Sequence, residues 1–206
     1  MLEKMFVLGA AVLALTCAPA VSHAALINAG GNVTETTATL DTTLGAAYSV
    51  PHVSDGGTTT RFVTWGHTSD YFAGGGTPPV FVIDLGGNVA MDAAAFWNYG
   101  GGNSTSSFAL KFATAADGTS GFGTSITYNP TFAPANLSNA IQQDFAFSQI
   151  VTARYVQLKL LDNYYTPTTG GDRVGMSEIQ FNEIPEPATL SLLALGGLMM
   201  VTRRNK

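Results

Sequence analysis

Residues 53–62, VSDGGTTTRF, hold oxygen-bearing side chains at a spacing that suits a calcium ion. Asp55 precedes two glycines, and Thr60 follows five residues later. Ca²⁺ prefers about six to eight oxygen ligands from carboxylates, hydroxyls and carbonyls, and a glycine-rich turn can direct several carbonyls inward. The pattern predicts a structural Ca²⁺ site in which Asp55 gives its carboxylate and Thr60 its hydroxyl and carbonyl. The alternative is an ordinary turn, since Asp-Gly is a common turn dipeptide.

The sequence gives little support for a zinc site or a catalytic site. Between residues 25 and 183 only His52 and His67 could join a zinc site, without cysteine or a His-Glu-x-x-His spacing. The chain has no G-x-S-x-G nucleophile elbow and no Walker loop. We therefore expect a non-catalytic protein. A hydrolase is the weakest alternative, because the separation of paired carboxylates is set by the fold.

Three clusters of aromatic and polar residues are candidates for a carbohydrate site. Sugars stack on aromatic faces and hydrogen-bond to polar groups at the rim of a site. The clusters are Trp65, His67, Asp70 and Tyr71; Asn163, Tyr164, Tyr165 and Arg173; and Trp97, Asn98 and Tyr99. Each has a structural alternative, and Trp97 favours the core because it continues an apolar strand.

Short strands must position these residues. The 206-residue chain is 46% apolar and 11% charged, with 23 glycines, which is typical of strands joined by tight turns. Apolar residues alternate over residues 79–85, 107–114, 153–161 and 176–182, and residues 117–123 form a turn by composition. This pattern predicts an all-β sandwich or barrel.

The N-terminus has the features of a secretory signal peptide. Lys4 precedes an apolar run over residues 5–15, and small residues follow. We expect a signal helix over residues 1–24, with cleavage between Ala24 and Ala25. The only cysteine, Cys17, lies within it, so the exported domain must rely on a large core or a metal for stability.

The domain between the terminal segments is acidic. Residues 25–183 contain twelve acidic and five basic side chains, a net charge of −7. Nucleic acids and anionic membranes require clustered Lys and Arg. We therefore expect no nucleic-acid partner, whereas Ca²⁺ and neutral sugars are compatible with this charge.

The C-terminus combines three features over residues 184–206. Pro185, Glu186 and Pro187 favour an extended segment, an apolar stretch approaches the length of about 20 residues that spans a bilayer, and a basic tip contains Arg203 and Arg204. By the positive-inside rule this tip would stay cytoplasmic. The alternative to a specialised signal is an ordinary membrane anchor.

Together these features resemble the PEP-CTERM sorting signal. The resemblance implies a Gram-negative bacterium, recognition by an exosortase, and transient attachment to the inner membrane through a C-terminal transmembrane helix. Delivery to the cell surface or extracellular matrix would follow, in families that often accompany exopolysaccharide production.

Residues 53–62, 80–99 and 153–181 resemble, in order and separation, the coagulation factor 5/8 type C (discoidin) family over about 130 residues. The resemblance implies a galactose-binding-like jelly-roll β-sandwich over residues 25–183. It also nominates Glu178 as a second carboxylate of the Ca²⁺ site. Phe62 departs from the family, which commonly has tryptophan there.

Our expectation is a surface module that binds extracellular polysaccharide without catalysis. Such a module should expose at least two aromatic side chains around its loops. The alternative is a structural or adhesive matrix protein with no discrete sugar site, in which the loops would be polar and rich in Gly and Thr.

Overall fold

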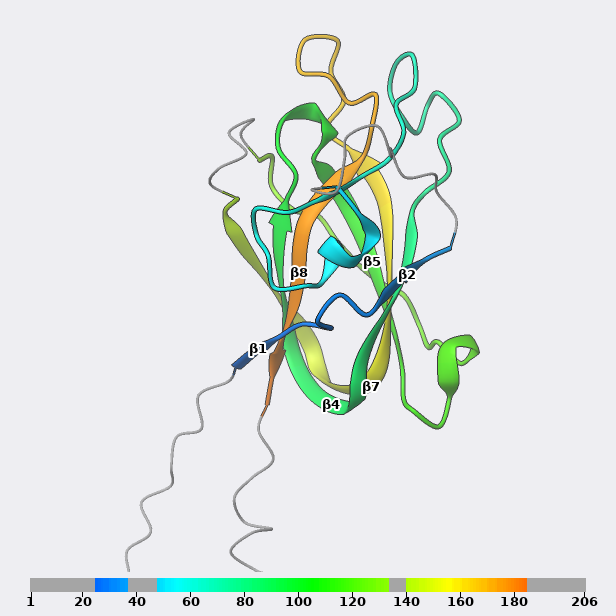
Figure 1. Ribbon diagram of the computed structural model, residues 1–206, viewed down its shortest axis with the longest axis vertical. Helices are drawn as coiled ribbons and strands as arrows, with labels where there is room; N and C mark the ends of the chain where they lie inside the picture. Colours follow the sequence, from blue (N-terminus) through cyan, green and yellow to red (C-terminus); the bar gives the residue numbers. More distant parts are fainter. Residues whose placement is uncertain (1–24, 37–47, 134–139, 185–206) are drawn as a thin grey trace, which may run out of the picture.

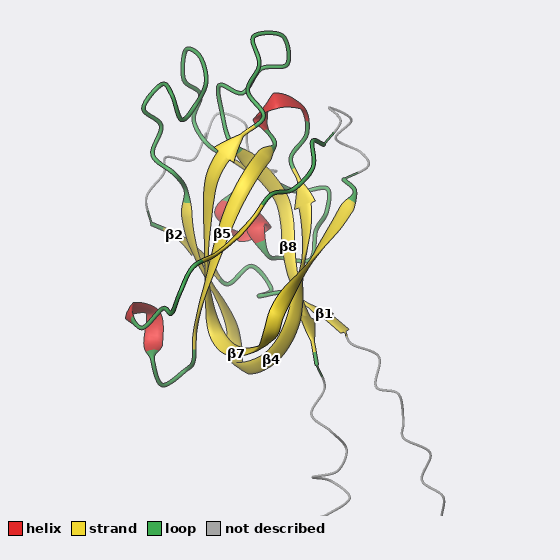
Figure 2. Ribbon diagram, turned by 180° about the vertical axis from the view of Figure 1, so that it is seen from behind, coloured by secondary structure: helices red, strands yellow, loops and turns green. Residues whose placement is uncertain are grey.

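Two long strands organise the domain. The computed structural model describes residues 25–36, 48–133 and 140–184, in which β4 spans Val80–Asn98 and β7 spans Gln142–Asn163. Residues 80–84 of β4 pair with residues 155–159 of β7, and residues 89–97 pair with residues 142–153. Between these stretches the pairing is interrupted and both strands bend. Each long strand therefore belongs to two layers, which face each other (Figures 1 and 2).

Six shorter strands and three 3₁₀ turns complete the described part. The strands are β1 (Ala25–Ile27), β2 (Val33–Glu35), β3 (Phe62–Val63), β5 (Thr105–Ala113), β6 (Ile126–Tyr128) and β8 (Gly175–Glu183). The 3₁₀ turns are η2 (Val50–Val53), η3 (Gly101–Asn103) and η4 (Gly118–Ser120). The antiparallel order is β1-β8-β4-β7-β5-β6, with β2 on β4 and β3 on β8.

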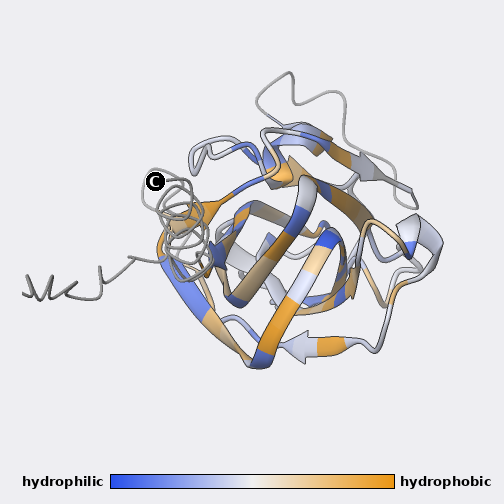
Figure 3. Ribbon diagram, turned by 90° about the horizontal axis from the view of Figure 1, so that it is seen from below, coloured by the Kyte–Doolittle hydropathy of each residue, from blue (hydrophilic) through white to orange (hydrophobic). Residues whose placement is uncertain are grey.

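The core lies between the two layers. Phe96 of β4 stacks on Phe108 of β5 with ring centroids 4.7 Å apart, and Phe62 of β3 meets Phe81 of β4 edge-on at the same distance. Figure 3 shows hydrophobic and hydrophilic residues alternating along the strands that enclose this core. Burial of these large rings supplies the main stabilisation, because the free energy gained scales with the apolar area removed from water.

The all-β prediction is confirmed, and each of the four expected strands overlaps an observed one, with residues 79 and 114 falling one residue outside β4 and β5. On β7, Val156, Leu158 and Leu160 are fully buried, as their alternation predicts. The sequence pattern does not predict that β4 and β7 continue so far. Gly86 and Gly87 resemble a turn signal, yet they lie within β4, where they allow a bend.

Both predicted terminal segments lie outside the described residues. This covers the signal helix, with Ala24 at the expected cleavage point, and the sorting signal from residue 185 onward, with Pro185, Glu186, Pro187, Arg203 and Arg204. In the described part, no helix is long and apolar enough to cross a membrane.

The two ends of the described domain lie side by side. Ala25 of β1 pairs with Glu183 at the end of β8. Figure 1 shows these ends at the lower side of the sandwich, while the loops before β4, after β4 and after β7 gather at the upper end. We call that upper end the loop end.

Candidate functional site

Two loops that are distant in sequence run side by side at the loop end. The backbone N–H of Thr64 donates to Val174 O at 3.0 Å, and that of His67 donates to Asp172 O at 2.8 Å. These bonds extend the β3–β8 pairing and place Trp65 beside Arg173 on the neighbouring segment. Two of the clusters predicted from sequence are thereby brought together.

Two large aromatic side chains are exposed at this end. Trp65 is 50% exposed and Phe132 is 46% exposed. The ring of Phe132 meets that of Tyr164 edge-on with centroids 5.3 Å apart, and the Tyr164 hydroxyl donates to the carbonyl of Pro130. Phe132 was not a predicted site residue, because nothing in its own segment distinguishes it from a core phenylalanine.

Tyr71 is a structural residue of the first loop instead of an open stacking surface. It is only 3% exposed, and its hydroxyl donates to Thr77 O at 2.7 Å. The ring of His67 packs edge-on against it at 5.0 Å. The carboxylate of Asp70 accepts from the N–H of Phe72 at 3.0 Å. Tyr71 therefore holds the loop that carries Trp65 in its shape, and His67 contributes by packing against the Tyr71 ring.

Asn163 holds the second loop. It is 7% exposed, and its Nδ2 donates to Gly171 O at 2.7 Å and to Arg173 O at 2.8 Å. Tyr165, which is partly buried, lies so close to Gly171 that an added Cβ there would fall 2.6 Å from its Cα. Asn163 thus positions Arg173 by closing the loop, and it does not face outward itself.

The third predicted cluster divides into scaffold and surface. Trp97 and Asn98 are buried, and Asn98 bonds the backbone of Thr105 through both of its side-chain groups. Tyr99 is partly exposed and lies under a guanidinium, with Arg61 Cζ 5.6 Å from its ring centroid. The alternative that Trp97 belongs to the core is the correct one.

Tyr99 joins residues from four segments into what we call the Arg61–Tyr99 cluster: Tyr48, Arg61, Tyr99 and Arg173. The rings of Tyr48 and Tyr99 lie 6.4 Å apart. Burial, reinforced by the neighbouring Tyr48, raises the pKa of Tyr99 to about 12, while Arg61 and Arg173 act in the opposite direction. The phenol is therefore neutral at physiological pH, and its hydroxyl shares a hydrogen bond with Tyr48 beside two cations. Sequence reasoning missed Tyr48 and Arg61, because only the fold places them beside Tyr99.

The predicted metal ligands also meet in the structure. Glu178 is fully buried, and its carboxylate accepts from the N–H of Asp55 at 3.2 Å and of Gly56 at 3.0 Å. The hydroxyl of Thr60 lies 3.4 Å from Asp55 Oδ1 and donates to Gly57 O at 3.0 Å. A Cβ on Gly57 would lie 2.5 Å from the Thr60 hydroxyl and 2.9 Å from Asp55 Oδ1, so any larger residue here would displace these two side chains.

The donor set fits a hard cation that accepts mixed oxygen ligands. In the described part, no group of three or more His, Cys, Asp or Glu side chains is placed to hold a metal ion. An ion here would therefore need hydroxyl and carbonyl oxygens beside the carboxylates of Asp55 and Glu178, and Ca²⁺ accepts such sets. His52 Nδ1 lies 2.5 Å from Asp55 Oδ2, so this imidazole occupies one side of the carboxylate.

The ionisation of Glu178 depends on this loop. Burial, with a smaller contribution from Asp55, raises the pKa of Glu178 to about 8 in spite of the two backbone N–H groups. A fully buried carboxylate needs either a proton or a nearby cation. In this setting the Glu178 carboxyl is either protonated or accompanied by a cation.

No family model matches the chain, and no curated protein matches it. Solved structures do match. A putative chitobiase fragment from Bacteroides thetaiotaomicron is 15% identical with a TM-score of 0.55, covering 81% of this chain and 97% of that one. CBM32-3, from a family 31 glycoside hydrolase of Clostridium perfringens, is 11% identical with a TM-score of 0.53, covering 77% and 95%. CpGH89CBM32-5 from the same organism, in complex with GalNAc-β-1,3-galactose, is 14% identical with a TM-score of 0.50, covering 77% and 99%.

Proposed function

The described domain has the fold of these carbohydrate-binding modules, and from it we propose that the chain is a non-catalytic carbohydrate-binding protein whose ligand docks at the loop end. The observation that carries the proposal is the half-exposed indole of Trp65 beside Arg173. An exposed aromatic face stacks on the C–H groups of a sugar ring. The neighbouring guanidinium can hydrogen-bond to the sugar hydroxyls, because arginine has five N–H donors in a fixed plane.

The remaining loop residues have supporting parts in this proposal. The Arg61–Tyr99 cluster adds the partly exposed, neutral phenol of Tyr99 near Trp65 and Arg173, while Arg61 itself is buried. Phe132 adds a second exposed ring, as the sugar-module hypothesis requires. Tyr71 and Asn163 keep the two loops in place, so that little flexibility is lost on binding.

The metal site has a structural role in the same proposal. Asp55, Thr60 and Glu178 would hold a Ca²⁺ ion together with carbonyl oxygens of the loop, and the ion would neutralise the buried Glu178 carboxylate. The hydrogen bonds from the N–H groups of Asp55 and Gly56 already tie the loop to β8 across more than 120 residues of sequence. A cation there would strengthen a long-range closure in a domain that has no cysteine.

Export and sorting complete the proposal. The terminal features favour a chain that is exported across the inner membrane of a Gram-negative bacterium and recognised by an exosortase at Pro185, Glu186 and Pro187. The domain geometry is compatible with this route, because β1 and β8 end opposite the loop end (Figure 1). A chain anchored beyond residue 184 would present the loop end away from the membrane, toward extracellular polysaccharide.

Affinity electrophoresis of the full chain with Ca²⁺ in gels that contain different polysaccharides tests carbohydrate binding. We expect one polymer to slow migration, and Trp65→Ala to weaken the interaction about tenfold, because a central aromatic anchor commonly contributes this much. Leu26→Ala, at an exposed apolar residue of β1, is the matched control and should change nothing.

Unchanged migration of the folded chain in every gel would favour the alternative function, a structural or adhesive matrix protein. The burial of several predicted sugar-site residues favours that alternative; these are Tyr71, Asn163, Trp97 and Asn98.

Sorting is tested separately in cells by Glu186→Ala, which should leave an unprocessed precursor at the membrane. Normal processing of this variant would show that the triplet is not the signal.

A further inference from the structure

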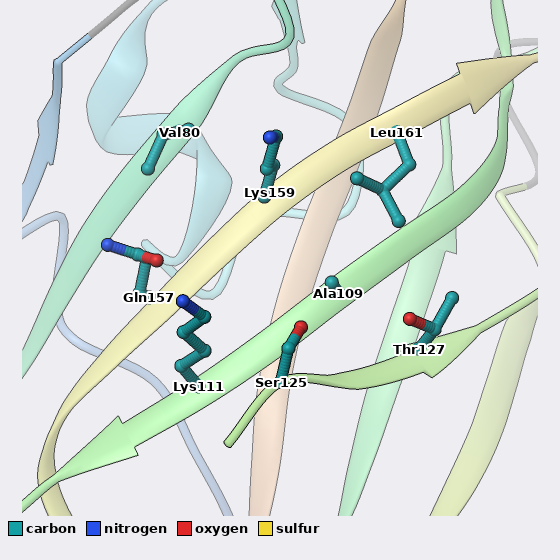
Figure 4. A pocket seen from close by; sticks show the side chains of 8 residues that line it. All are labelled: Val80, Ala109, Lys111, Ser125, Thr127, Gln157, Lys159 and Leu161. Carbon is teal, nitrogen blue, oxygen red and sulfur yellow. The ribbon is translucent and has the colours of Figure 1, made fainter. Parts of the chain in front are cut away.

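A hollow of about 390 Å³ lies on the outer face of the sheet, over strands instead of loops (Figure 4). Ala109 of β5 forms its floor, because it lies between two longer neighbours. Its partner on β7 is Lys159, and its partner on β6 is Thr127. Two residues further along β5, on the same face, Lys111 pairs with Gln157. The short methyl group among longer side chains produces the depression.

The hollow concentrates positive charge. Lys111 and Lys159 are the only lysines of residues 25–183, and Figure 4 shows both side chains rising from the same face. Neither forms an ion pair within the described residues. Arg154, by contrast, binds both carboxylate oxygens of Asp84, at 2.8 and 2.9 Å. A domain with a net charge of −7 therefore carries two uncompensated cations at one site.

Beside the apolar Val80 and Leu161, three further lining residues offer groups that match hydroxyls. Ser125 and Thr127 contribute hydroxyls, and Gln157 contributes an amide, each of which can donate and accept. None of these side chains makes a hydrogen bond to another described residue. Their hydrogen-bonding capacity is thus available to a ligand.

We propose that this hollow is a second binding site, which takes a carboxylate-bearing sugar of an acidic polysaccharide. The ammonium groups of Lys111 and Lys159 pair with the uronate carboxylate, and Ser125, Thr127 and Gln157 bond the ring hydroxyls. The hollow has no aromatic lining residue, so recognition depends on charge and hydrogen bonds instead of stacking. The site is independent of Trp65 and of the loop end.

Two features favour a polysaccharide over an acidic polypeptide. Most of the hollow lies over β5 and β7, which are interior strands of the sheet, and only its margin at Thr127 lies on the short edge strand β6. A peptide strand lying over β5 and β7 would therefore find no backbone partners, whereas peptide recognition by sheets commonly uses an unpaired edge. A polyhydroxylated chain needs only side-chain partners, and these are present.

Isothermal titration of the full chain in nonionic detergent tests the proposal, with a short oligogalacturonide as ligand and a maltodextrin of equal length as the neutral control. Divalent cations are omitted because they bind uronates themselves, and a melting curve checks that the chain is folded. We expect binding of the uronate alone. Lys111→Gln and Lys159→Gln should each weaken it about three- to fivefold, and the double variant about tenfold or more.

Matched variants distinguish a specific binding site from nonspecific attraction between the lysines and any acidic polymer. Lys111→Arg with Lys159→Arg keeps the charge and should keep most of the affinity. Ala109→Leu fills the hollow and Thr127→Val removes one hydroxyl; both keep the charge and should weaken binding. Trp65→Ala should leave uronate binding unchanged.

Four outcomes would overturn the proposal. The first is no uronate binding by the folded wild-type chain, and the second is binding that survives the double lysine-to-glutamine change. The third is binding that neither Ala109→Leu nor Thr127→Val weakens. The fourth is equally tight binding of poly-glutamate that is lost in the same variants, since the hollow would then be a site for acidic polypeptides.

Discussion

Glu178 is the residue whose sequence pattern and structural setting disagree most plainly. A glutamate in a strand with alternating apolar residues would normally face water. Instead it is fully buried, because the loop of residues 53–57 closes over β8 and brings Asp55 and Gly56 against its carboxylate. Such a buried carboxyl either keeps its proton and is neutral, or is ionised with a cation beside it. A pH dependence of stability follows.

Without Ca²⁺, the chain should lose stability as the pH rises from about 4.5 to 8. The pKa of Glu178 is raised from 4.5 to about 8 in the folded state, so the folded state retains a proton that the unfolded state has released. The free energy of unfolding therefore falls by up to about 1.4 kcal/mol per pH unit in this window. Urea denaturation in the presence of a chelator, at several pH values, measures this slope.

Glu178→Gln supplies the comparison for that slope, because it keeps the shape of the side chain without a titrating group. The difference between wild type and variant should appear only in this pH window, and added Ca²⁺ should flatten the wild-type slope by replacing the proton. Equal slopes for the two proteins would rule out Glu178 as their source.

At the scale of elements, the bend of β4 decides the architecture. Gly86 adopts a φ of 81° at this bend, where its N–H binds the Asp84 carboxylate at 2.8 Å. Beyond it, β4 leaves its pairing with residues 155–159 of β7 and continues beside β8. The bend therefore connects the layer that carries the lysine hollow with the layer that carries Glu178.

Gly86→Ala should destabilise the domain by about 1–2 kcal/mol, because a Cβ disfavours positive φ even where space is open. No atom lies within 4 Å of the position a Cβ would take at Gly86 or at Gly87, and only Gly86 has a positive φ. Gly87→Ala is thus a control with the same added methyl group and no backbone strain. Thermal unfolding of both variants measures the effect, and an equal loss in both would contradict the argument.

At the scale of the whole molecule, three features lie in different places. The loop end carries Trp65 and the Arg61–Tyr99 cluster, the outer face of one layer carries the lysine hollow, and the domain ends emerge opposite the loop end (Figures 1 and 2). The loop containing Asp55 fastens β8 to the segment before β3. Metal binding there should therefore be read out by the cooperative unfolding of the entire domain.

A chelator should lower the melting temperature of the full chain. With Ca²⁺ at about one hundred times its dissociation constant the ion contributes about 2.7 kcal/mol, which corresponds to about 5–10 °C for a domain of this size. Asp55→Ala should abolish the difference between Ca²⁺ and chelator. Asp117→Ala removes a carboxylate from a remote surface turn and should leave it intact. Indifference of the wild type to chelator would refute the Ca²⁺ proposal.

The sequence by itself determined the all-β class, the four strands with clear alternation and the turn at residues 117–123. These depend on local periodicity and on turn composition, which act over a few residues. It also brought Asp55, Thr60 and Glu178 to attention, two from their spacing and one from a family resemblance. The terminal signals remain predictions of the same kind, since they too depend on local composition.

Only the tertiary structure decided which candidates are surface and which are scaffold. Tyr71 and Trp65 belong to similar polar, glycine-rich surroundings, yet one is buried and the other half exposed. Strand pairing placed Lys111 beside Gln157 and Lys159 beside Ala109, and loop packing brought Arg61 to Tyr99. Such contacts depend on the register and bending of strands that are far apart in sequence, and local patterns carry no information about either.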